Sequence, residues 1–256
     1  MAPAKLVLFF LWSAVLVPMQ LIVMTMSRSK PAYTIPRLWH RGVCRILGLH
    51  VIVEGQPHTG NQVIFISNHM SYLDIPVIGS VLKASFVAKG EVAQWPVFGF
   101  LSKLQQTAFV SRSRTTLGND KNNLETMLKD GRSMIIFPEG TSTDGRTVVP
   151  FKSSLFSIAL ADDGTDIWLQ PMTLSLISVD GRDPVEQTVR DLYAWHGDMT
   201  LTPHLSGFGK IRGATIKITF HAPVRARATP DRKILAQTCY ESVLSGLENP
   251  ALAFAA

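Results

Sequence analysis

The chain has 256 residues, of which 46% are hydrophobic and 17% charged, so it can bury the core of one domain and carry one additional segment. The formal net charge of +6 suits either nucleic acid or an anionic membrane, but no stretch interleaves aromatic and basic residues as a base-stacking surface does, so we expect no nucleic-acid partner. The two cysteines, Cys44 and Cys239, lie far apart and in no paired motif, which argues against a disulfide framework and a metal site and favours a reducing compartment.

The first predicted element is an uncharged apolar run from Leu6 to Met26, which as a helix is long enough to cross roughly 30 Å of hydrocarbon. Pro18 and Gln20 lie within the run, so a kinked helix embedded in the membrane surface is the alternative. More basic residues follow the run than precede it: Lys5 lies before it, and Arg28, Lys30, Arg37 and Arg41 lie after it. The positive-inside rule therefore predicts that residues 1–30 anchor the chain in the inner (cytoplasmic) membrane, with the remainder on the cytoplasmic side.

Residues 31–50 form the second predicted element, a short two-faced helix. Arg37, Arg41 and Arg45 recur every four residues, and Trp39 is one of the apolar residues between them. Such a helix can lie among lipid headgroups with its arginines on anionic lipid. The same pattern is also typical of a helix that packs its apolar side on a protein core.

Residues 51–248 alternate between short apolar runs and helical patterns, which predicts an α/β domain with a single, mostly buried sheet flanked by helices. The strand candidates are His50 to Val53, Val63 to Ser67, Ser85 to Ala88, Ala108 to Val110, Met134 to Phe137, Ile167 to Ile177 and Thr215 to Phe220. The helix candidates are the segment from Asp74, the segment from Leu117 to Leu128, Lys152 to Leu160, and Arg232 to Leu247. Residues 249–256 are predicted to be a short tail.

A polar corner follows the strand candidate Val63 to Ser67, with His69 and Asp74 on either side of the turn into the next helix. If the turn brings the two side chains together, Asp74 can orient the imidazole and leave its second ring nitrogen as a general base for a hydroxyl group. The pattern has a purely structural alternative, because Ser71 followed by Asp74 also forms a helix capping box. A serine hydrolase using Ser67 or Ser71 is a weaker alternative, since neither serine lies in a Gly-x-Ser-x-Gly elbow.

Three further stretches carry candidate binding residues. Pro138 and Gly140 set a turn after the strand candidate Met134 to Phe137, and this turn presents Glu139 and backbone amides. Arg112 follows Phe109 just past another strand end, where an arginine can hold a phosphate, although such loops are often simply solvated. Pro171 interrupts the strand candidate Ile167 to Ile177, which favours a sheet edge or a bulge near a site.

These stretches, in this order and spacing, resemble the bacterial glycerolipid acyltransferases, specifically the lysophosphatidate acyltransferase family. Asn68 to Asp74 resembles the catalytic His and Asp block of that family, and Phe109 to Arg112 resembles its second block. Phe137 to Thr141 reads Phe-Pro-Glu-Gly-Thr, as in the third block, with Phe151 and Lys152 matching the Phe-Lys that follows. Leu169 to Leu174 resembles the hydrophobic block with its proline.

The resemblance implies a glycerol-3-phosphate acyltransferase-like fold and a membrane-associated enzyme of lipid biosynthesis. Its reaction is the transfer of a fatty acyl group from a thioester, on acyl carrier protein or coenzyme A, to the hydroxyl of a lysolipid, with no further cofactor. His69 and Asp74 are then expected to be catalytic. The expected substrate-binding residues are Asn68, Ser71, Arg112, Glu139, Gly140, Thr141 and Lys152.

The first expectation for the acceptor is 1-acylglycerol-3-phosphate, giving phosphatidate. Two departures leave a lyso-ornithine lipid as the alternative. Ser142 stands where the family usually has an arginine, and Gln106 stands where it usually has a glycine. The segment from Tyr193 to Met199, together with Thr143 to Gly145, is more similar to the lyso-ornithine lipid acyltransferase branch, whose acceptor has no phosphate. A lipid-binding anchor without catalysis is the alternative from another class.

Overall fold

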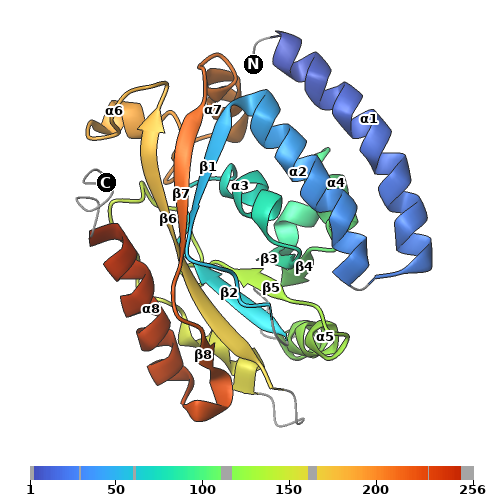
Figure 1. The fold of residues 1–256 in the computed structure, drawn as a ribbon, viewed down its shortest axis with the longest axis vertical. Helices are drawn as coiled ribbons and strands as arrows, with labels where there is room; N and C mark the ends of the chain where they lie inside the picture. Colours follow the sequence, from blue (N-terminus) through green and yellow to red (C-terminus); the bar gives the residue numbers. More distant parts are fainter. Residues whose placement is uncertain are drawn as a thin grey trace.

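A computed structural model of the chain describes residues 3–28, 30–59, 62–110, 117–160, 166–229 and 231–248. Its centre is a mixed, mostly parallel sheet with helices on both faces (Figure 1). The strands are β1 Leu49–Glu54, β2 Val63–Ser67, β3 Ser85–Lys89, β4 Ala108–Val110, β5 Met134–Ile136, β6 Trp168–Val179, β7 Ala214–Phe220 and β8 Val224–Arg225. The α-helices are α1 Pro3–Met26, α2 Thr34–Leu47, α3 Asp74–Val81, α4 Phe98–Leu104, α5 Leu117–Lys129, α6 Gln187–Arg190, α7 Leu201–Phe208 and α8 Arg232–Glu248. Short 3₁₀ helices are η1 Lys30–Tyr33, η2 Gly90–Gln94, η3 Ser153–Leu160 and η4 Ala226–Ala228.

The strand order is β1-β7-β6-β2-β5-β3-β4, and β8 pairs with β6 outside this path. The pairs of β2 with β5 and with β6 are parallel, whereas β6 and β7 are antiparallel. Side chains of β2 alternate between two cores, since Val63 and Phe65 pack with α2 and α3, whereas Ile64 and Ile66 pack with α5, η3 and α8. This two-sided burial explains why β2 reads as a continuous apolar run.

The predicted strands and long helices are present, but three expectations were incomplete or wrong. Residues 153–160 form a 3₁₀ helix rather than an α-helix. The short helices α4, α6 and α7 were not predicted, because each has too few residues for a clear apolar period. Pro171 lies neither at an edge nor at the bulge of β6, since that strand is central and its register shifts between Leu176 and Ser178.

Pro171 is tolerated in a central strand because the neighbour of β6 changes at this position. On one side Pro171 is aligned with Ile66 of β2. On the other side β8 pairs only as far as Leu169, and β7 begins to pair at Met172. The missing N–H of the proline therefore removes no bond from either antiparallel ladder.

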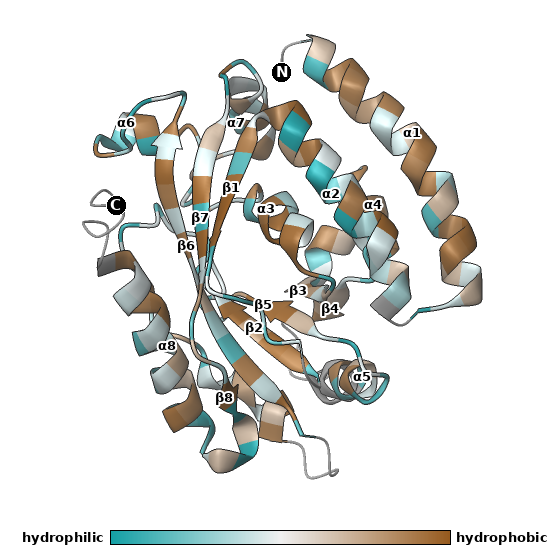
Figure 2. Ribbon diagram, viewed as in Figure 1, coloured by the Kyte–Doolittle hydropathy of each residue, from teal (hydrophilic) through white to brown (hydrophobic). Residues whose placement is uncertain are grey.

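The helix α1 confirms the predicted apolar N-terminal helix, and it is the one helix of the described residues that is long and apolar enough to cross a membrane. Most of its exposed side chains are apolar, from Leu6 to Met26, and brown predominates along this helix in Figure 2. Its inner side packs along α2, where Trp12 Nε1 donates to the carbonyl of Trp39 at 3.1 Å. Further along, Gln20 Nε2 donates to the carbonyls of Ala32 in η1 and Leu104 in α4 at 3.1 and 3.0 Å. Such a helix can present one side to lipid while the other stays attached to the domain.

The helix α2 lies between α1 and α3 and buries its apolar side in the protein. The Nε atoms of Arg37 and Arg41 both donate to the carbonyl of Ser80 near the end of α3, at 3.2 and 3.0 Å. This geometry corresponds to the core-packing alternative for residues 31–50, with Arg45 exposed on the outer side.

Candidate active site

The candidate site lies where the neighbouring parallel strands β2 and β5 end, beside the continuing strand β6. Ile66 of β2 is aligned with Ile136 of β5 and with Pro171 of β6, so the residues that follow these positions emerge at the same edge of the sheet. Ligand sites of open parallel sheets are typically built at this edge. The register therefore brings the loop after β2, which carries His69, next to the turn after β5, which carries Glu139.

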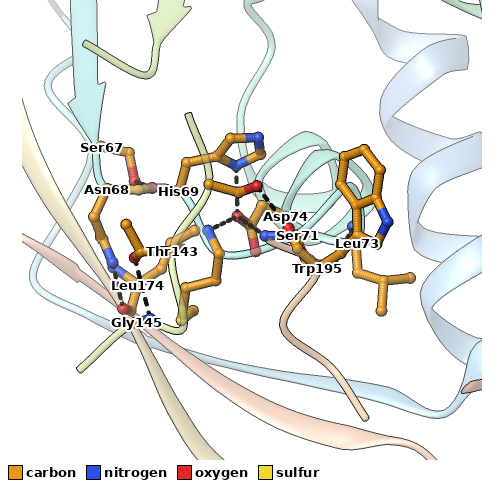
Figure 3. A network of polar contacts seen from close by, with 12 residues as sticks. Ser67, Asn68, His69, Ser71, Leu73, Asp74, Thr143, Gly145, Leu174 and Trp195 are labelled. Carbon is orange, nitrogen blue, oxygen red and sulfur yellow. Dashed lines mark hydrogen bonds and ion pairs between the residues drawn. The ribbon is translucent and has the colours of Figure 1, made fainter. Parts of the chain in front are cut away.

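His69 and Asp74 form the pair at the centre of this edge (Figure 3). His69 Nδ1 and Asp74 Oδ2 are 2.8 Å apart. Because a carboxylate oxygen only accepts, Nδ1 donates this hydrogen bond and Nε2 carries the ring's lone pair. Nε2 has no hydrogen-bond partner in the described part of the chain, and the His69 side chain is 21% exposed while that of Asp74 is fully buried. Asp74 thus orients the imidazole through Nδ1 and leaves Nε2 accessible to take a proton.

The Asp74 carboxylate is held on both oxygens. Oδ2 also accepts the backbone N–H groups of Met70 and Ser71 at 2.7 and 2.9 Å, and Oδ1 accepts the hydroxyl of Tyr193 at 2.8 Å. The bond from the Ser71 N–H is one half of the predicted capping box. The other half is absent, since Ser71 Oγ accepts from the Leu73 N–H instead. The same carboxylate therefore both closes the turn and orients His69.

Glu139 supports the His69 backbone from the neighbouring strand end. Its Oε1 accepts the N–H of His69 and its Oε2 accepts the N–H of Val149, both at 2.7 Å. Glu139 is 2% exposed, and this burial raises the pKa of its carboxyl group to about 7, against the opposing effect of the two N–H donors. The imidazole of His69 also stacks on Phe137, with ring centroids 4.1 Å apart. The turn after β5 therefore fixes both the backbone and the ring of His69.

Asn68 ties the His69 loop to β6. Its side-chain Nδ2 donates to the carbonyl of Leu174 at 3.0 Å, and its Oδ1 accepts the N–H of Leu174 at 2.8 Å (Figure 3). The pairing of β2 with β6 ends at Ser67 and Met172, so this amide continues the ladder beyond the last backbone pair. Asn68 is fully buried and lies in the framework of the site rather than on its surface.

The remaining predicted binding residues lie around this framework. Gly140 adopts a left-handed backbone with φ of 70°, and the Nζ of Lys152 lies against it in the space that a Cβ would fill. The backbone N–H of Lys152 donates to the Pro138 carbonyl at 3.0 Å, and Thr141 is exposed beside Gly140. Arg112 lies outside the described residues.

The geometry does not support a serine hydrolase that uses Ser67 or Ser71 as its nucleophile. Ser67 and Ser71 are fully buried, and both hydroxyls hydrogen-bond to backbone groups rather than to His69. A nucleophilic serine needs its hydroxyl within hydrogen-bond reach of the base.

The segment that follows α6, which includes Tyr193, Trp195 and His204, contacts the site although no role was predicted for it from the sequence. Tyr193 reaches Asp74 from this segment, and the N–H of Trp195 donates to the Met70 carbonyl at 2.8 Å. The hydroxyl of Tyr72 pairs with Nδ1 of His204 on α7 at 2.9 Å. The one signal in the sequence was the run from Tyr193 to Met199, which resembles a particular branch of the family.

An apolar cavity of about 370 Å³ lies between α1 and α2 on one side and α3, α4 and α7 on the other. Tyr72 and Leu73, from the loop between His69 and Asp74, form part of its wall. Its volume is within the range of roughly 300–1,000 Å³ that is typical of small-molecule sites. The candidate site thus adjoins an apolar compartment beneath the helix that has the exposed apolar face.

The fold and site combine a histidine–aspartate pair beside the ends of parallel strands with an adjoining apolar cavity that α1 helps to line. The family model described as Acyltransferase matches residues 50–175. A lyso-ornithine lipid O-acyltransferase of Brucella abortus is 36% identical over 223 residues, covering 85% of this chain and 83% of the relative. A 1-acyl-sn-glycerol-3-phosphate acyltransferase of Neisseria meningitidis is 30% identical over 205 residues, covering 79% of this chain and 76% of the relative.

The crystal structure of the 1-acyl-sn-glycerophosphate acyltransferase PlsC from Thermotoga maritima has the same fold, with a TM-score of 0.66 over 96% of this chain and 95% of that chain at 20% identity. The chain therefore belongs to the acyltransferase family.

Proposed function

We propose that this chain is a lyso-ornithine lipid O-acyltransferase, which transfers a fatty acyl group from a thioester to the free hydroxyl of a lyso-ornithine lipid. The higher identity to a relative of that name, 36% against 30% for the glycerophosphate enzyme, supports this acceptor. Ser142, in place of the arginine expected after Thr141, supports it further, because a side chain suited to hold a phosphate is missing there. The geometry that carries the proposal is the 2.8 Å contact between His69 and Asp74 with Nε2 accessible.

In the proposed reaction, His69 Nε2 removes the proton from the acceptor hydroxyl as its oxygen attacks the thioester carbonyl. Asp74 keeps the proton on Nδ1 and stabilises the imidazolium that forms. When the tetrahedral intermediate collapses, the carbon–sulfur bond breaks, an ester is left on the lipid, and the thiolate takes the proton from His69. General-base help of this kind contributes about 10²- to 10⁴-fold to the rate.

The other residues then have two kinds of role. Glu139, Asn68 and Ser71 hold the His69 loop through the contacts described above. Gly140, Thr141 and Lys152 form the rim beside it, where the exposed Lys152 supplies positive charge, and Arg112 remains a proposed headgroup contact. The apolar cavity between the N-terminal helices and the domain suits an acyl chain.

The proposed location is the inner face of the cytoplasmic membrane. The exposed apolar side of α1 supports contact with lipid, and the basic residues that follow α1 support the cytoplasmic side and an affinity for anionic lipid. Acyl carrier protein or coenzyme A delivers the thioester from that side.

The acceptor is tested by competition. Purified full-length protein in mixed micelles receives a labelled acyl carrier protein or coenzyme A thioester together with equal amounts of lyso-ornithine lipid and lysophosphatidate. The proposal predicts that most of the label enters ornithine lipid. Label mainly in phosphatidate would replace the acceptor by 1-acylglycerol-3-phosphate, and no transfer to either lipid would favour a non-catalytic anchor.

A further inference from the structure

A tyrosine far along the chain contacts the oxygen of Asp74 that does not face His69. The hydroxyl of Tyr193 donates to Asp74 Oδ1 at 2.8 Å, and neither residue has exposed surface. The two residues are 119 positions apart. We propose that Tyr193 is a positioning residue for the acyl transfer, which holds the Asp74 carboxylate in the orientation that aims His69. This inference rests on the proposed role of the His69–Asp74 pair.

Tyr193 completes the set of contacts that prevents the carboxylate from turning. Oδ2 accepts from His69 Nδ1 and from the N–H groups of Met70 and Ser71, whereas Oδ1 accepts from Tyr193. Without the hydroxyl, Oδ1 would be a charged and fully buried oxygen that no other described residue donates to, and the carboxylate would gain by rotating toward another donor. Rotation about the Cβ–Cγ bond moves Oδ2 as well, and with it the imidazole that depends on it.

The ring of Tyr193 is fixed well enough to act in this way. It packs edge-to-face on Phe208 of α7, with ring centroids 6.2 Å apart. Burial and the nearby Asp74 carboxylate raise the pKa of Tyr193 well above its ordinary value, so the phenol keeps its proton and remains a donor. A protonated phenol held by a packed ring is a rigid hydrogen-bond donor.

The segment around Tyr193 holds the same loop at further points. The N–H of Trp195 donates to the carbonyl of Met70, and Tyr72 hydrogen-bonds to Nδ1 of His204. Nε2 of His204 lies 3.0 Å from the carbonyls of Asp191 and Ala194, which makes Nε2 the protonated nitrogen and Nδ1 the acceptor for Tyr72. Residues 191–204 therefore hydrogen-bond to the loop at Met70, Tyr72 and Asp74. Of these contacts, the one from Tyr193 reaches the His69–Asp74 pair.

The test is Tyr193→Phe, which keeps the packed ring and removes only the hydroxyl. We expect kcat to fall about tenfold, as loss of a hydrogen bond to a charged group would give, while KM for thioester and acceptor stays within twofold. The matched control is Tyr33→Phe, because Tyr33 is also buried and its hydroxyl pairs with Ser85 Oγ, away from the pair. This control should lose thermal stability without a fall in kcat.

A double-mutant cycle separates positioning from general support of the fold. If Tyr193 acts through Asp74, then Tyr193→Phe should cause no further loss of kcat in an Asp74→Asn background. A wild-type kcat in Tyr193→Phe, an equal fall in Tyr33→Phe, or a further tenfold loss in the Asp74→Asn background would each overturn the inference alone. Wild-type activity in Asp74→Asn would instead overturn the proposed role of the pair.

Discussion

Replacing Asn68 by alanine tests how firmly the candidate site is built into the sheet. The Asn68 amide makes two hydrogen bonds, one to the N–H and one to the carbonyl of Leu174, and both residues are fully buried. Alanine leaves these two backbone groups without partners in a place that water does not reach. At about 1–3 kcal/mol for each unsatisfied group, the free energy of unfolding should fall by about 2–6 kcal/mol.

Chemical denaturation of the detergent-solubilised protein, followed by tryptophan fluorescence, measures this change. Gln187→Ala is the matched control, because that amide is exposed on α6 and donates to Asp191, four residues away, so its loss should change the free energy of unfolding by at most about 0.5 kcal/mol. If the free energy of unfolding falls by less than about 1 kcal/mol in Asn68→Ala, this amide does not extend the sheet in the way described.

Two further predictions concern Glu139 and Gln106. Because the folded-state pKa of Glu139 is raised from 4.5 to about 7, the folded state binds more protons than the unfolded state between these values, so stability should fall as pH rises from 4.5 to 7. Glu139→Gln should reduce this dependence in denaturation curves at pH 5 and pH 8, and an unchanged slope would contradict the assigned pKa. Gln106 is buried with φ of 58°, and neither of its amide atoms has a partner among the described residues, so Gln106→Gly should raise the melting temperature by an amount equivalent to about 1 kcal/mol. Gln105→Gly, which removes hydrogen bonds to His40 and Ala84, should lower it, and a lower melting temperature in both variants would contradict the strain at Gln106.

The parts of the fold that the sequence predicts are those whose signal is local. Apolar runs marked β2 and β5, and the polar residues that end them marked the corner with His69 and the turn with Glu139. The spacing of two polar residues within one loop, such as His69 and Asp74, can indicate a pair because a single turn is enough to bring them together, but it did not exclude the capping-box alternative.

The parts that the sequence did not predict depend on which strands become neighbours. Pro171 favoured an edge, and only the change of partner from β8 to β7 explains its central position. Tyr193 has no local pattern that indicates a contact with a carboxylate 119 residues earlier. The backbone contacts of Glu139 likewise follow from the alignment of β2 with β5, which no spacing reveals.

His69 is proposed to remove the proton from the lipid hydroxyl, and single-turnover acyl transfer by His69→Ala is the sharpest test of that role. This variant should fold with a melting temperature near that of the wild type, bind lyso-ornithine lipid, and lose at least about 10²-fold in the rate of ester formation. Ester formation at the wild-type rate by the folded variant would mean that His69 is not the base.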